Sequence, residues 1–374
     1  MDEKRANFRL ARVLLALGGA SLVLGMLAGL ARIEWPTRLG GPAVASHAPL
    51  MVSGFLGTLI CLERAVGTGW RWALLLPFIS GLGALGIALG VDGARWALVL
   101  PGLGLAGLYL RLARRPSLPY LLPMAVGAAA WAMGNALWAL GRPLDTAVAW
   151  WQAFLVTTIV AERLELARIG LQGRAPGALF LAGLLLLWAS GSLALTGNPL
   201  HRLVAGLGMA LLALWLLLYD VARRNLRLQG LYRYMGVALL SGSLWLAVGG
   251  LLSLVAFFAP ELPLRDALLH SVFLGFVMGM VFAHGPLIFP SVSRLPFAYH
   301  PVLFATLALL HLSLVARVVG GLLGLAPLRS WGGLGNALAP TLFFGSVVGL
   351  AVRGRKGRSI RPAERAEGGH GRAG

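Results

Sequence analysis

The sequence has 374 residues, of which 58% are hydrophobic and only 12% are charged. Soluble domains usually carry about 25% charged residues, so this composition excludes an ordinary soluble protein. The formal net charge is +19, but the arginines stand in short clusters between apolar blocks. No basic stretch of the sequence is interleaved with aromatic residues as in a nucleic-acid-binding domain. We therefore expect a lipid bilayer, and not a nucleic acid, as the partner.

Twelve apolar blocks follow one another along the chain. A helix of about 20 apolar residues crosses the hydrocarbon core of a bilayer, and lipid favours helices because the backbone must satisfy its own hydrogen bonds. The predicted spans cover residues 10–31, 44–63, 71–90, 94–112, 118–140, 145–164, 176–196, 199–220, 232–258, 264–284, 299–323 and 333–352. The first block is too long for the core of a typical signal peptide, so we expect it to be retained as a helix.

The predicted fold class is therefore all-α, a polytopic membrane helix bundle with about 12 transmembrane helices. Residues 1–352 form a single transmembrane domain, and residues 353–374 form a basic tail whose Arg-, Gly- and Glu-rich composition predicts disorder.

The basic residues of the connecting segments predict the orientation, because cytoplasmic loops are enriched in Lys and Arg. With the N-terminus inside, most of the basic residues fall in inside segments. The outside segments hold only Arg32, Arg38, Arg95, Arg142, Arg202, Arg265 and Arg329. We therefore expect the cell inner (cytoplasmic) membrane as the location, with the N-terminus, the C-terminus and the basic tail in the cytoplasm.

One segment of the chain is echoed four spans later. Residues 55–64 (FLGTLICLER) end span 2, and residues 154–163 (FLVTTIVAER) end span 6. Residues 273–275 (FLG) of span 10 are a fainter version. Such self-similarity predicts three arcs of four helices, with spans 2, 6 and 10 in equivalent places. The Glu-Arg pair that closes the first two segments is interpreted as an interfacial ion pair.

Ionisable groups inside a membrane are costly and usually face the bundle interior. In the predicted orientation, His47 of span 2 and His270 of span 10 lie at a similar outer depth. His311 lies near the middle of span 11, and Arg317 lies about 9 Å further toward the outside at 1.5 Å per residue. His284, before Gly285-Pro286, is expected to cap a helix end or to lie at the interface.

Two histidines at matched depth can hold a haem edge-on, each giving one axial nitrogen to the iron. Arg317 is a candidate partner for the propionates, because arginine binds carboxylates bidentately. The alternative for His47 and His270 is a hydrogen-bonded structural role, and for His311 and Arg317 a role without a cofactor or substrate.

Other chemistry is not indicated. The single cysteine, Cys61, excludes an intrachain disulfide and a cysteine-based metal site. The sequence has no P-loop, no His-Glu-x-x-His and no Gly-x-Gly-x-x-Gly after a predicted strand. Whether the protein is an enzyme stays open.

Twelve spans, a four-span repeat, and histidines in the outer halves of spans 2 and 10 resemble the catalytic subunits of haem–copper oxidases and nitric oxide reductases. In that superfamily, histidines on helices 2 and 10 hold the low-spin haem, and His47 and His270 match those places. Helices 6 and 7 carry the copper-ligating histidines there, whereas spans 6 and 7 have none here. We therefore do not expect an oxygen-reducing binuclear centre.

The chain is more similar to the NnrS family of twelve-helix membrane proteins, which are linked to haem, copper and the nitric oxide response. Residues 46–51 (SHAPLM), followed by Gly54-Phe55, resemble the helix 2 motif of that family. Residues 270–279 resemble its late His-and-Gly helix, and Arg317 resembles an arginine in the next helix. Pro49 stands where the family has a second histidine, so copper has no clear ligand set here.

The leading hypothesis is a b-type haem-binding membrane protein of NnrS-like character, with a role in redox or nitric oxide stress and a small gas or redox protein as partner. His47 and His270 are the expected haem ligands, and His311 and Arg317 complete the predicted cofactor site. One alternative is a cofactor-free transporter or channel for a small anion or polar solute, with His311 and Arg317 along its path. Another is a membrane assembly subunit.

Overall fold

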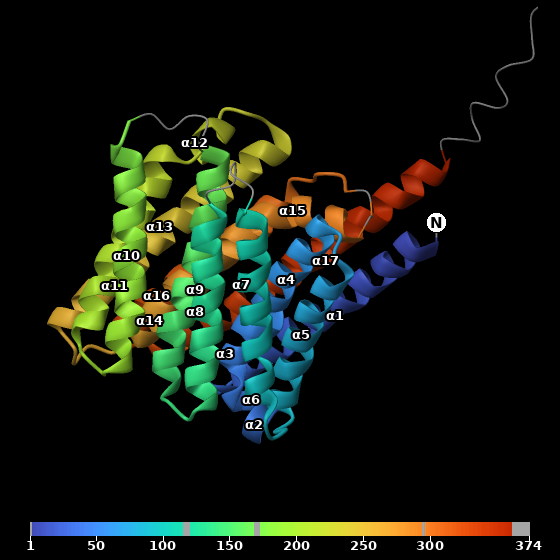
Figure 1. Cartoon of the computed structure of the whole chain (residues 1–374). Coiled ribbons are helices and arrows are strands. Elements are labelled where there is room, and N and C mark those ends of the chain that lie inside the picture. The colour runs from blue at the N-terminus through green and yellow to red at the C-terminus, as the bar shows by residue number, and fades with distance from the viewer. Residues whose placement is uncertain (1, 115–119, 168–172, 294, 296, 361–374) are drawn as a thin grey trace, which may run out of the picture.

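The computed structural model describes residues 2–114, 120–167, 173–293, 295 and 297–360, and over these residues the chain is helical and contains no strand (Figure 1). Twelve of the helical stretches in this part of the chain are long and apolar enough to cross a membrane. The prediction of an all-α polytopic bundle is confirmed, and the protein is a multi-pass membrane protein.

Seven of the twelve spans are single α-helices. These are α1 (Asp2–Ala31), α8 (Leu121–Ala139), α9 (Leu144–Ala167), α10 (Ala175–Leu195), α11 (Leu200–Tyr219), α13 (Gly230–Phe258) and α16 (Val302–Leu322). The last span lies within an eighth, longer helix, α17 (Ala326–Ile360).

The remaining spans are composite. Span 2 joins α3 (His47–Pro49), the π-helix η1 (Leu50–Gly57) and α4 (Thr58–Thr68). Span 3 joins the 3₁₀-helix η2 (Arg71–Leu74) and α5 (Leu75–Ala88), and span 4 joins α6 (Ala94–Ala97) and α7 (Val99–Ala113). Span 10 joins α14 (Arg265–His270), the π-helix η4 (Ser271–Met278) and α15 (Gly279–Ser293). The short helices α2 (Gly41–Ala45) and α12 (Ala222–Asn225) lie in connections between spans.

Successive spans run in opposite directions, so the start of α1 and the end of α17 lie at the same end of the bundle (Figure 1). We call this the terminal end. The opposite end, which carries α2, α3 and α6, is called the distal end (Figure 1). An even number of spans requires this arrangement of the two chain ends, whichever way the bundle lies in the membrane.

Spans 2, 5, 6 and 10 form the interior of the bundle. In each of these spans, between 61% and 67% of the residues in an apolar 18-residue stretch are buried, against 33–44% in the other spans. The outer spans turn leucines such as Leu75, Leu103 and Leu181 outward, which suits lipid contact because lipid tails are as apolar as leucine. The shared burial of spans 2, 6 and 10 favours their equivalence, although span 5 is equally buried, and the three arcs stay a prediction.

Span 10 continues to Ser293, well past the predicted end at residue 284. Pro286 cannot donate the backbone hydrogen bond that the carbonyl of Phe282 would otherwise accept. The hydroxyl of Tyr234 donates to that carbonyl instead, at 3.2 Å. Arg12 donates to the carbonyl of Ser293 with Nε and Nη2, at 3.1 and 2.9 Å. Neighbouring spans thus satisfy carbonyls that proline and the helix end leave free, which is how proline is tolerated in membrane helices.

The last helix is also longer than predicted. The backbone of α17 is helical to Ile360, so the predicted start of the disordered tail at residue 353 is too early by eight residues. Residues 361–374 of that tail lie outside the described residues.

Candidate functional site

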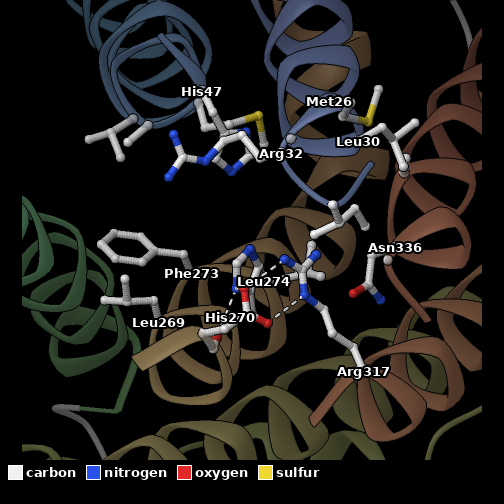
Figure 2. A pocket seen from close by; sticks show the side chains of 18 of the residues that line it. Met26, Leu30, Arg32, His47, Leu269, His270, Phe273, Leu274, Arg317 and Asn336 are labelled. Atoms are coloured by element: carbon white, nitrogen blue, oxygen red, sulfur yellow. Dashed lines mark hydrogen bonds and ion pairs between the residues drawn. The ribbon is translucent and has the colours of Figure 1, made fainter. Parts of the chain in front are cut away.

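A cavity of about 300 Å³ opens among spans 1, 2, 6, 10, 11 and 12 near the distal end. Figure 2 shows His47 on one side of it and His270 on the other, with their rings turned toward one another. We call it the histidine cavity. Its apolar lining includes Met26, Leu30, Met51, Leu269, Phe273, Leu274 and Met278.

His47 is the first residue of α3 and is held against α1. Its Nδ1 lies 2.7 Å from the carbonyl oxygen of Gly25. A carbonyl can only accept, so Nδ1 carries the proton and Nε2 of the neutral ring keeps its lone pair. Gly29 makes room for the ring, because a Cβ at that position would lie 2.8 Å from Cε1 of His47.

His270 ends α14 and is held within its own helix. Its Nδ1 lies 2.8 Å from the carbonyl oxygen of Asp266, one turn earlier. The same reasoning leaves a lone pair on Nε2 of His270. The centres of the two imidazole rings are 6.4 Å apart, and their planes differ by 22°. No described residue forms a hydrogen bond with either Nε2 atom.

A π-helix follows each of the two histidines, and such segments concentrate at functional sites. A tryptophan from a neighbouring span packs on a glycine of each π-helix. A Cβ at Gly57 of η1 would overlap the ring of Trp131, and one at Gly275 of η4 would overlap Trp245. Trp131 donates its Nε1 hydrogen to Oγ of Ser53, at 2.9 Å. The π-helices η1 and η4 are therefore packed in similar ways, each with a glycine against the tryptophan of a neighbouring span.

The structure does not bring His311 to the histidine cavity. Trp245 donates to its Nδ1 at 3.0 Å, so the ring proton is on Nε2, which donates to Oγ of Ser241 at 2.8 Å. Both ring nitrogens are thus engaged, and no lone pair is left for a metal. His311 supports Trp245, which in turn packs on η4.

Arg317 lines the histidine cavity, as expected, but it already has a partner. Its Nε and Nη2 donate to the two carboxylate oxygens of Asp266, at 2.9 and 2.8 Å. Arg265 also lines the cavity and is paired with Asp145 at the surface. The arginines Arg32 and Arg329 line it without any side-chain hydrogen bond or ion pair to a described residue.

The described lining of the cavity therefore holds four arginines and one carboxylate residue, Asp266. This surplus of positive charge favours an anionic ligand. Asn336 adds a polar group: its Nδ2 donates to Oγ of Ser313 at 2.7 Å, while its buried Oδ1 has no hydrogen-bond partner among the described residues. The sequence pattern did not single out Arg32, Arg329 or Asp266 as site residues. Arg32 and Arg329 stand in two predicted outside segments, far apart in the sequence, that come together only in the folded chain.

A second ionic group lies toward the terminal end. Arg163 of α9 donates to both carboxylate oxygens of Asp220, at 2.5 and 2.7 Å. His284, predicted to stand at a helix end, lies inside α15, with Nε2 3.3 Å from Nη1 of Arg163. The interpretation of Glu162 and Arg163 as a pair is wrong, because Glu162 pairs with Arg64 of span 2 and Arg163 with Asp220.

No group of three or more His, Cys, Asp or Glu residues in the described part of the chain could hold a metal ion. A copper ion in the histidine cavity would have two imidazoles as ligands. The methionine thioethers of the lining are the other soft donors that copper(I) accepts.

Residues 9–352 match the model of a protein family described as "Domain of unknown function (DUF8744)". No curated protein and no solved structure matches the chain. The family match spans all twelve membrane helices and the whole histidine cavity. The chain therefore belongs to the DUF8744 family.

Proposed function

We propose that this protein is a b-type haem-binding membrane protein with a redox role, in which His47 and His270 would hold the haem iron. The observation that carries the proposal is the 6.4 Å separation of two facing imidazoles. Metal–imidazole bonds of about 2.0–2.1 Å put the ring centres of two ligands on opposite sides of one ion roughly 6 Å apart. Metal-ligating histidines also commonly donate their other ring N–H to a backbone carbonyl, as both do here.

The rest of the cavity suits the proposed cofactor. Methionine, leucine and phenylalanine side chains supply apolar walls for the porphyrin. Haem propionates are anionic, and arginine binds carboxylates bidentately. Arg32 and Arg329 are better candidates for this contact than Arg317, because Arg317 is committed to Asp266.

Haem bound by two histidines supplies one-electron transfer at a buried site. Because both imidazoles would be used to hold the iron, the ligand set favours exchange of electrons with a redox partner over direct binding of a small gas. The resemblance to the NnrS family connects such a role with nitric oxide stress. The predicted loop charges support a cytoplasmic membrane location with both termini in the cytoplasm, which would put the cavity near the outer face.

A visible spectrum of the detergent-purified protein, produced in cells supplied with a haem precursor, tests the proposal. We expect a Soret band that carbon monoxide does not shift after reduction. His47→Ala and His270→Ala should each abolish or strongly displace the band. His201→Ala is the matched control, because His201 lies in the first turn of α11 with its Nδ1 2.8 Å from the carbonyl of Asn198.

Absence of a Soret band from the wild-type protein, despite sufficient haem, would overturn the proposal. Metal analysis of the same sample would show whether copper occupies the two histidines instead. A band that survives both cavity substitutions would place haem elsewhere and would equally count against the proposed ligands.

A second candidate function is a cofactor-free transporter or channel for a small anion. The observation that favours it is the pair of arginines, Arg32 and Arg329, that line the cavity and form no ion pair with any described residue. In this case the spectrum would be blank, and anion flux into liposomes would fall in Arg32→Gln and Arg329→Gln. His311→Gln should leave the flux unchanged, because His311 does not line the cavity.

A further inference from the structure

The two cavity histidines are held in chemically different ways. Among the described residues, the hydrogen-bond partner of His47 is a neutral backbone carbonyl, that of Gly25 at 2.7 Å. His270 is held by the carbonyl of Asp266 at 2.8 Å, and the Asp266 carboxylate lies close by as well. The distance from Oδ1 of that carboxylate to Nδ1 of His270 is 3.3 Å. Only one of the two rings therefore has a negative charge beside its N–H group.

Helix geometry explains why one residue supplies both contacts. Asp266 and His270 are four positions apart, so they are neighbours on one face of α14. The backbone carbonyl of Asp266 points along the helix toward the His270 ring, while its side chain reaches the ring from outside the helix. No such residue serves His47, whose partner Gly25 comes from another span and has no side chain.

Arg317 fixes the position of the carboxylate. It donates to both oxygens of Asp266, at 2.9 and 2.8 Å, and dashed lines mark the contacts of the labelled Arg317 in Figure 2. The arginine side chain is 10% exposed and the aspartate side chain 33% exposed, so the pair is largely removed from solvent. The positive charge of Arg317 also offsets the negative charge that Asp266 presents to His270.

We propose that Asp266 is a positioning residue that makes His270 the stronger electron donor of the two ligands, and that Arg317 limits this effect. The proposal rests on the proposed haem site. A negative charge close to the N–H group of a ligating histidine raises the basicity of that ligand, because it favours positive charge on the ring. A more basic ligand and a nearby negative charge both favour the oxidised, more positive iron. The carboxylate thus lowers the reduction potential, and the guanidinium raises it.

The test is a spectroelectrochemical titration of three variants of the full-length, haem-loaded protein. Asp266→Asn removes the negative charge while keeping the side-chain size, and we expect a higher midpoint potential than in the wild type. Arg317→Gln removes the opposing positive charge, and we expect a lower midpoint potential. Asp145→Asn is the control, because it removes a carboxylate whose partner is Arg265 and which has no contact with either cavity histidine. Its potential should change least.

The opposite signs separate this role from a structural one. If Asp266 and Arg317 only hold α14 against α16, breaking the pair from either side should shift the potential in the same direction or not at all, and this would overturn the inference. Thermal unfolding of the haem-free variants shows whether each still folds. Should Asp266→Asn fail to fold, Asp266→Glu, which keeps the charge but moves it, must still shift the potential more than Asp145→Asn. A wild-type protein without a Soret band would refute the haem site itself, which is a separate result.

Discussion

Each end of the bundle holds an ion pair of aspartate and arginine with a histidine beside it. At the terminal end, Arg163 and Asp220 are 2% and 3% exposed. Nδ1 of His284 lies 2.7 Å from the carbonyl of Met280, one turn earlier, and Nε2 lies 3.3 Å from Arg163. Both ring nitrogens of His284 therefore have partners, and no lone pair of this histidine is left for a ligand.

At the distal end, His270 shares the first of these contacts but not the second. Its Nδ1 lies near a carbonyl one turn earlier, and Arg317 turns its donors to Asp266 instead of to the ring. Nε2 of His270 is left facing the cavity and His47. The residue types alone therefore do not mark a site, because both ends of the bundle have them. The distal end differs because Nε2 of His47 and Nε2 of His270 keep lone pairs there that no described residue engages. The guanidinium groups of Arg32 and Arg329 also form no ion pair with any described residue.

The largest expected effect is on stability at the terminal end. Asp220→Ala leaves the Arg163 guanidinium buried without a counter-ion, and breaking a buried pair from one side costs about 3–5 kcal/mol. Asp266→Ala should cost less, because its carboxylate is a third exposed and water can replace it around Arg317. Thermal unfolding of both variants in one detergent compares them. Equal losses of stability in the two variants would contradict the expectation that the more buried ion pair contributes more.

A smaller effect is expected from filling the space beside His47. In Gly29→Ala, the new Cβ would lie 2.8 Å from Cε1 and 2.9 Å from Nδ1 of His47, so the ring must leave the Gly25 carbonyl. Overpacking of this kind costs about 1–3 kcal/mol, and the haem content of the purified protein should fall. Gly19→Ala is the control on the same helix, because nothing lies within 4 Å of a Cβ there. Wild-type haem content in Gly29→Ala would contradict this arrangement of His47.

The smallest effect is expected from Asp145→Asn, which removes the partner of Arg265 at the surface of the distal end. Both side chains are more than half exposed, and exposed ion pairs contribute about 0.2–1 kcal/mol, less at high salt. Unfolding midpoints at low and high salt measure this contribution. A loss as large as that of Asp220→Ala would show that the distal surface pair also supports the cavity wall.

Depth in the membrane could be predicted from the sequence because it follows from few quantities. Span length sets where a helix crosses, loop charge sets its direction, and the rise per residue sets the depth of a side chain. These placed His47 and His270 at matched depth. The prediction failed where depth was insufficient: His311 also lies within a span, but it faces Trp245 and Ser241 and not the cavity.

Sequence alone determined that this protein is a twelve-span helical membrane protein, because long apolar runs have no other stable form in lipid. It also determined which two histidines could meet. Only the tertiary structure decided what surrounds them, since the direction of a side chain depends on the rotation of each helix, and the wide turns of η1 and η4 change that rotation locally. The pairing of Arg317 with Asp266, and the gathering of Arg32 and Arg329 at the same cavity, follow from contacts between spans that no single apolar run encodes.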